Sequence, residues 1–198
     1  MFVTFEGIDG SGKSTQAELL AGALRDEGRE VVATREPGGT ELGERIRELL
    51  LGGPAISGWA EAALFAAARA ELVEQVIRPA LDRGADVVCD RYVDSSLAYQ
   101  GIARGLGLER VLDLNLAAVG GLLPDVTFLL LLDPDTARRR HPGEPDRIER
   151  EGGGFQAGVD RAYRELATAF PTRIVTIDGA RAPEDVAAEI RGRLRALA

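Results

Sequence analysis

The sequence predicts one α/β domain in three layers, with a five-stranded, mostly parallel sheet between two layers of helices. Its 198 residues are the length of a single domain. Short apolar runs alternate with longer helical patterns, and no internal repeat or linker-like stretch divides the chain. Strands that alternate with helices are typical of βαβ units, in which helices cover both faces of a parallel sheet.

The five strands are expected where short runs are rich in apolar, β-branched and aromatic residues. These runs are 2–6, 30–34, 86–90, 126–132 and 173–178. The first helix begins near Lys13 and repeats leucine and alanine at helical spacing, and the last follows Pro183 and an acidic first turn. Four further helix-favouring segments cover 40–51, 57–83, 107–120 and 155–169.

The composition excludes several classes of protein. A net charge of −8 argues against general nucleic-acid binding, which depends on neutralising phosphates. The longest strongly apolar run, 128–132, is far too short to span a bilayer, and we expect no signal peptide at the amino terminus. A single cysteine excludes an internal disulfide, and a single histidine leaves little from which to build a zinc site. We therefore expect a cytoplasmic protein with neither nucleic-acid nor membrane partners.

Lysine occurs once, in a glycine-rich segment after the first strand. Of the 24 basic residues, only Lys13 is not arginine, and its ammonium is a compact point charge rather than a planar fork. Residues 7–14 fit the phosphate-binding pattern G-x-x-x-x-G-K-[ST] between a strand and a helix, where this loop belongs. Its glycines let backbone N–H groups surround phosphate, and the helix N-terminus adds partial positive charge. The expected ATP-binding residues are Gly7, Ile8, Asp9, Gly10, Ser11, Gly12, Lys13, Ser14 and Thr15.

This loop serves several protein classes, which differ in what lies opposite the nucleotide. Lys13 is expected to reach the outer phosphates, and Ser14 to offer a hydroxyl to Mg²⁺. A switch GTPase reads guanine through N-K-x-D, which is impossible here because the one lysine is already in the loop. A small chain rich in arginine points instead to a kinase that acts on a small phosphorylated acceptor.

Two further segments end strands of the predicted sheet. Asp90 and Arg91 follow the third strand, and residues at the carboxyl end of a parallel strand project into the ligand crevice. Asp90 is suited to hold water on Mg²⁺ and Arg91 to clamp a phosphate, whereas an ordinary salt bridge is the alternative. The segment 34–40, taken alone, is expected to be a turn in which Thr40 caps the next helix.

Six segments together resemble the bacterial thymidylate kinases. They are GIDGSGKST at 7–15, TREPGGT at 34–40, LFAAARA at 64–70, DRY at 90–92, YQG at 99–101 and DRIE at 146–149. Their order and spacing agree with that family along essentially the whole chain. The resemblance implies the fold of P-loop nucleoside monophosphate kinases, transfer of the ATP γ-phosphate to dTMP with Mg²⁺, and a homodimer.

The resemblance also implies roles on the acceptor side. Asp9 would bind the sugar 3′-hydroxyl, and Arg91 would hold the acceptor phosphate. Phe65 would stack on thymine, Arg69 would hydrogen-bond a base carbonyl, and Tyr99 would crowd the sugar 2′ position. The full set of expected substrate-binding residues is Asp9, Arg35, Pro37, Phe65, Arg69, Arg91, Ser95, Ser96, Tyr99 and Gln100.

Several of these residues have a structural interpretation when the resemblance is set aside. Phe65 and Tyr99 lie in apolar helical stretches, where aromatic side chains usually belong to the core. Arg69 would pair with one of three nearby glutamates on a solvated helix face, and Ser96 would bond its own helix.

The segment 137–154 is expected to be a mobile lid. A run of three arginines there is a solvated basic loop by default, but phosphoryl transfer needs positive charge around the transferring group. Members of the family take this charge from an arginine in the phosphate loop or from one in the lid. Because Gly10 stands at the phosphate-loop position, the chain resembles the members in which the lid supplies the arginine. The candidates are Arg138, Arg140 and Arg147, which join Lys13, Asp90 and Arg91 in the expected catalytic set.

Two alternatives remain open from the sequence. One is another small P-loop kinase for a different nucleotide or for a nucleoside. The other is a regulatory protein that binds ATP without transferring its phosphate, although the chain keeps Lys13, Ser14, Asp90 and Arg91.

Overall fold

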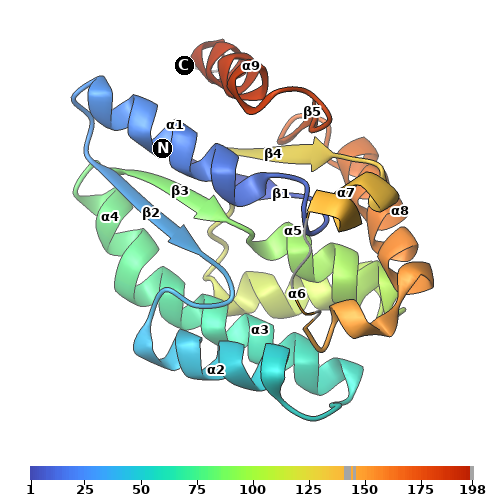
Figure 1. Cartoon of the computed structure of the whole chain (residues 1–198). Helices are drawn as coiled ribbons and strands as arrows, with labels where there is room; N and C mark the ends of the chain where they lie inside the picture. The colour runs from blue at the N-terminus through green and yellow to red at the C-terminus, as the bar shows by residue number, and fades with distance from the viewer. Residues whose placement is uncertain (141–143, 145, 197–198) are drawn as a thin grey trace.

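A computed structural model of the chain describes residues 1–140, 144 and 146–196. These residues form a sheet of five parallel strands in the order β2-β3-β1-β4-β5 (Figure 1). The strands are β1 Phe2–Glu6, β2 Val31–Arg35, β3 Asp86–Asp90, β4 Val126–Leu131 and β5 Ile174–Asp178. The predicted sheet is confirmed. Its second strand lies one residue later than expected, and two other boundaries move by one residue.

Helices connect the strands. The α-helices are α1 Lys13–Asp26, α2 Glu41–Gly52, α3 Gly58–Leu72, α4 Arg78–Asp82, α5 Val93–Ser96, α6 Leu108–Ala118, α7 Pro134–Arg140, α8 Gly153–Ala169 and α9 Pro183–Arg195. Two π-helical turns, η1 Val73–Ile77 and η2 Leu97–Ala103, continue α3 and α5, and a 3₁₀ turn, η3 Glu149–Glu151, precedes α8. The segment predicted as helical over 57–83 is therefore one helical run with a π-helical turn inside it.

The three arginines of the expected basic loop lie in a helix instead. Pro134 begins α7, and the Asp133 carboxylate accepts hydrogen bonds from the backbone N–H and the hydroxyl of Thr136 at 2.9 and 3.0 Å. Such a side chain satisfies the free N–H groups of a first turn. The arginines fall in the last turn, where positive charge is favourable to the helix dipole. The remainder of the predicted lid includes residues 141–143 and 145, which lie outside the described residues.

The sheet buries a different set of side chains on each face. Figure 1 shows α1 and α9 on one face and α3, α6 and α8 on the other. In β4, Phe128 and Leu130 pack with α1 and α9, whereas Leu129 between them packs on the opposite side with Leu72 and Tyr163. This alternation follows from the two-residue period of a strand and gives a core on both faces.

The register of the central strands determines where the loops after them lie. Phe5 on β1 pairs with Asp90 on β3, and Arg35 on β2 pairs with the same Asp90. Because the strands are parallel, the loops that follow all three leave from one edge of the sheet. No helix among the described residues is long and apolar enough to cross a membrane.

We predict that Phe128→Ala destabilises the protein by about 3–5 kcal/mol, because a fully buried aromatic ring leaves a cavity that the strand cannot close. Urea unfolding followed by circular dichroism measures the change. Leu19→Ala on α1 is the control, since Leu19 is 39% exposed and its loss should cost less than about 0.5 kcal/mol. Equal losses in the two variants would contradict the assignment of Phe128 to the core.

Candidate active site

The loop between β1 and α1 forms one wall of a cavity of about 770 Å³. Gly10 has φ 79°, and a Cβ atom at this position would lie 2.1 Å from the backbone oxygen of Ala137 in α7. Gly12 has φ 97° and immediately precedes the helix that begins at Lys13. Glycine is thus needed at Gly10 for backbone conformation and for the close approach of α7. The predicted residues from Asp9 to Thr15 all line this cavity, whereas Gly7 and Ile8 are not part of its lining.

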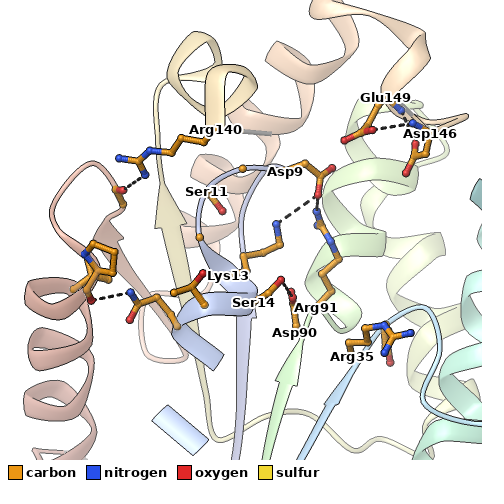
Figure 2. A pocket seen from close by; sticks show the side chains of 18 of the residues that line it. Asp9, Ser11, Lys13, Ser14, Arg35, Asp90, Arg91, Arg140, Asp146 and Glu149 are labelled. Carbon is orange, nitrogen blue, oxygen red and sulfur yellow. Dashed lines mark hydrogen bonds and ion pairs between the residues drawn. The ribbon is translucent and has the colours of Figure 1, made fainter. Parts of the chain in front are cut away.

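Lys13 is almost entirely buried in the floor of the cavity. Its Nζ donates to the carbonyl oxygen of Ile8 at 3.0 Å and lies 3.7 Å from Oδ1 of Asp9 (Figure 2). Burial lowers the pKa of Lys13, the positive charge of Arg91 acts in the same direction, and Asp9 opposes both. The ammonium is therefore held inside the loop, where an anionic ligand would stabilise the charged form that burial disfavours.

Ser14 and Asp90 place oxygen ligands beside the phosphate loop. The Ser14 hydroxyl donates to Oδ2 of Asp90 at 2.5 Å, while Oδ1 of Asp90 is buried without a hydrogen-bond partner in the described structure (Figure 2). Oxygen ligands from one carboxylate and one hydroxyl are what Mg²⁺ takes from a protein when phosphates and water complete its shell. These two residues thus fit the ion predicted for this position.

Arg91 extends from the loop after β3 into the same space. It has φ 69°, a left-handed conformation that is uncommon outside glycine and asparagine. Its guanidinium donates to Oδ1 of Asp9 at 2.5 Å, to the Ser95 hydroxyl at 3.1 Å and to the Tyr163 hydroxyl at 3.2 Å. It also lies over the ring of Tyr99, 5.5 Å from the centroid. The alternative of an ordinary strand-end salt bridge is wrong, because Arg91 pairs with Asp9 of the phosphate loop rather than with Asp90.

A second cavity, of about 100 Å³, adjoins the first. Asp9, Glu36 and Arg91 are among the residues that line both cavities, so Arg91 borders both spaces. Eight of the ten predicted substrate-binding residues line the second cavity, namely Asp9, Pro37, Phe65, Arg91, Ser95, Ser96, Tyr99 and Gln100. Tyr99 is 7% exposed and its hydroxyl has no hydrogen-bond partner among the described atoms, so it belongs both to the core and to the cavity wall.

The other two predicted substrate-binding residues lie elsewhere. Arg35 lines the large cavity, where it donates to the Glu44 carboxylate at 3.1 and 3.2 Å. Arg69 is 1% exposed and lies behind the second cavity rather than in its lining. The interpretation that places Arg69 on a solvated helix face is wrong, because its side chain is buried against Glu36, Ser96, Asn115 and the carbonyl oxygen of Tyr92.

Glu36 lines both cavities and has no predicted role. Oε2 of Glu36 accepts from Nε of Arg69 at 2.7 Å, whereas Oε1 is buried without a partner among the described residues. Burial raises the pKa of Glu36 to about 7, although Arg69 acts in the opposite direction. The sequence shows Glu36 only as one letter of the segment 34–40, and its contact with Arg69 spans 33 positions. Arg47, which lines both cavities and donates to the carbonyl oxygen of Pro37 at 3.0 Å, is likewise not predicted.

The three lid arginines occupy different environments. Arg140 lines the large cavity and donates to the carbonyl oxygens of Gly179 and Ala180 at 2.8 and 3.3 Å (Figure 2). Arg138 is exposed and pairs with its helix neighbour Asp135. Arg147 is largely buried and donates to Glu61 and to the backbone oxygen of Leu50, both at 2.6 Å. Only Arg140 of these three candidates lies in the cavity wall, and Arg181, which was not predicted, lines the cavity as well.

Comparison with known proteins identifies close relatives along the full chain. The family model for thymidylate kinase matches residues 5–190. Thymidylate kinase of Clavibacter michiganensis is 53% identical over all of this chain and 95% of the relative, and that of Bifidobacterium longum is 48% identical over all of this chain and 98% of the relative. A crystal structure of thymidylate kinase from Ehrlichia chaffeensis superposes with a TM-score of 0.81 at 35% identity, over 98% of each chain. The resemblance drawn from the six segments is confirmed.

We predict that Glu36 makes the stability of the protein fall with rising pH. Its folded-state pKa of about 7 lies above the usual 4.5, so between these values the folded state binds more protons than the unfolded state. The free energy of unfolding contributed by this group therefore decreases as the pH passes through that range. Glu36→Gln removes the titration and keeps an oxygen for Arg69.

Urea unfolding of both proteins between about pH 5 and pH 8 tests this assignment. The wild-type protein should lose stability relative to Glu36→Gln across the range. A difference between the two proteins that stays constant with pH would show that Glu36 does not titrate there.

Proposed function

The chain belongs to the thymidylate kinase family, and we propose that its two adjoining cavities transfer the γ-phosphate of ATP to dTMP, giving dTDP and ADP. The observation that carries this proposal is the position of Arg91. It lines both the cavity of the phosphate loop and the smaller cavity walled by Phe65, Tyr99 and Gln100. A phosphate bound to Arg91 would therefore sit where a donor in one cavity and an acceptor in the other meet.

On the donor side, the loop from Asp9 to Gly12 would provide backbone N–H groups for the ATP phosphates, and Lys13 would provide a point charge on the outer ones. Ser14 and Asp90 would hold Mg²⁺, which when bound neutralises charge that develops on the phosphates. The unpartnered Oδ1 of Asp90 supports this assignment. Asp90 keeps Ser14 in place through the 2.5 Å hydrogen bond between them.

On the acceptor side, Arg91 would exchange its ion pair with Asp9 for the phosphate of dTMP, which frees Asp9 to accept from the 3′-hydroxyl. Arg35 and the turn at Pro37 supply further contacts near that phosphate. Phe65 in the cavity wall supports stacking on the base, and Tyr99 supports exclusion of a 2′-hydroxyl. Ser95, Ser96 and Gln100 line the same cavity, and we assign them to the sugar and base edges. We assign Arg69 to positioning these walls through Glu36 and Ser96, because its guanidinium lies outside the lining.

We further propose that the segment 137–154 acts as a lid over the large cavity, with Arg140 as its arginine. Arg140 now binds two backbone oxygens, and exchanging them for phosphate oxygens would place its charge on the transferring group. The resemblance also supports a homodimer, and Leu49 on α2 and Trp59 on α3 offer exposed apolar surface for it. We place the enzyme in the cytoplasm, where its nucleotide substrates are made and used.

The first test is the choice of acceptor. We predict Mg²⁺-dependent ADP formation with dTMP, and at least about a tenfold lower kcat/KM for dUMP, UMP, CMP, AMP and GMP. Preference for another acceptor would be consistent with ATP binding at the phosphate loop but would contradict the assignment of the second cavity to thymine. ATP binding without turnover of any acceptor would indicate a regulatory ATP-binding protein.

The second test concerns the lid arginine. Arg140→Met should lower kcat by about a hundredfold or more and change the KM for dTMP little, because its charge would act mainly in the transition state. Arg139→Met is the matched control. Arg139 lies in the same helix directly before Arg140, carries the same charge, and among the described side-chain hydrogen bonds donates only to Thr136. If both variants lost kcat equally, the effect would come from α7 as a whole and the assignment of Arg140 would fail.

A further inference from the structure

Glu61 on α3 is a buried carboxylate that none of the predicted roles includes. It is 1% exposed and accepts hydrogen bonds from three side chains that lie 39 to 86 positions away. Gln100 Nε2 donates to its Oε1 at 2.8 Å, Arg104 donates to both oxygens at 2.5 and 2.8 Å, and Arg147 donates to Oε2 at 2.6 Å. The carboxylate therefore joins the wall of the second cavity to Arg147, within the segment 137–154.

The charge state of Glu61 determines what Gln100 can do. Burial favours the neutral acid, but the hydrogen bonds from Arg104, Gln100 and Arg147 outweigh it and lower the pKa of Glu61. An ionised carboxylate only accepts hydrogen bonds, so Gln100 has to turn its NH₂ group toward it. A neighbour that could also donate would leave the two orientations of the amide close in energy.

Gln100 is also part of the second cavity. It is 1% exposed and lines that space with Phe65, Ser96 and Tyr99. Since its amide nitrogen is turned toward Glu61, the carbonyl oxygen on the other branch of the amide points away from that carboxylate. Facing the cavity that Gln100 lines, this oxygen would be a fixed hydrogen-bond acceptor near Phe65.

We propose that Glu61 is a positioning residue for base selection, which fixes the Gln100 amide so that its oxygen accepts from the ring N–H of thymine. This inference rests on the proposed function. Cytosine carries a lone pair in place of that N–H, so its nitrogen would face the Gln100 oxygen with no proton between them. A site built to accept a hydrogen bond rejects a base that lacks the donor.

Equilibrium binding of dTMP and dCMP, measured by calorimetry, tests the proposal. The wild-type protein should bind dTMP at least about tenfold more tightly than dCMP. Glu61→Gln keeps the shape of the side chain but can donate as well as accept, so Gln100 can reverse and the preference should fall by about tenfold or more. Gln100→Met removes the acceptor and should lower the preference to a similar extent.

The double variant distinguishes positioning from general damage to the fold. In the Gln100→Met background, Glu61→Gln should leave the ratio of the two dissociation constants unchanged, because Glu61 acts through Gln100. Arg104→Lys is the matched control: it alters two other hydrogen bonds of Glu61, keeps a positive charge beside the carboxylate, leaves the Gln100 contact in place, and should keep the wild-type ratio.

Three outcomes would overturn the proposal. They are a wild-type protein without preference for dTMP over dCMP, an unchanged ratio in Glu61→Gln, or a further change when Glu61→Gln is added to Gln100→Met. Because the readout is binding, it is independent of phosphoryl transfer. A protein that shows the expected ratios but produces no dTDP would contradict the proposed function while supporting the role of Glu61.

Discussion

The buried carboxylate of Glu6 determines how the two sides of the site meet. It ends β1 directly before the phosphate loop, is fully buried, and accepts from the backbone N–H groups of Tyr92 and Ser95 and from the hydroxyls of Ser95 and Tyr163, at 2.6 to 3.1 Å. Burial raises the pKa of Glu6, and the hydrogen bonds from Ser95 and Tyr163 act against this because they stabilise the ionised carboxylate. The loop that carries Arg91 is thereby fastened to the strand that carries the phosphate loop, and α8 is fastened to both.

The balance of charged side chains around the large cavity differs from the net charge of the whole chain. The net charge is −8, yet the described residues that line the large cavity include six basic and six acidic side chains. Several cations there already have carboxylate partners, as in the pairs Arg91–Asp9 and Arg35–Glu44. Of these two, Arg91 is the largely buried one, and Asp9 compensates its charge, so an anion that binds there would replace the carboxylate instead of neutralising an isolated charge. Net charge excludes classes of partner, but it does not describe the field inside a cleft.

Most of the cavity wall is implied by the resemblance of the six segments to the family rather than by local patterns. Local patterns are sufficient to predict the sheet, the phosphate loop and the helices, because each depends on spacing within a short segment. The strand over 2–6, the loop over 7–14 and the long helical run over 57–83 are examples. Side chains whose role depends on partners far along the chain were not predictable. The partner of Glu36 is Arg69, which lies 33 positions away, and the partner of Arg147 is Glu61, which lies 86 positions away, so neither contact shows in the local pattern around these residues. A charged residue at the end of an apolar strand, such as Glu6, is a local signal of a buried polar contact, because the strand that carries it is buried.

The segment 137–154, which we propose as a lid, contacts the site at Ala137 and at Arg147. On one side, α7 rests on Gly10 so closely that any side chain there would meet the Ala137 backbone. On the other side, Arg147 bonds Glu61 and the backbone oxygen of Leu50 beside the acceptor cavity. Arg140 lies between these two attachments, in the cavity wall. If the segment moves as the proposed lid, it would pivot on contacts with the phosphate loop and with Glu61, so the phosphate loop, Arg140 and the second cavity would be connected through this one segment.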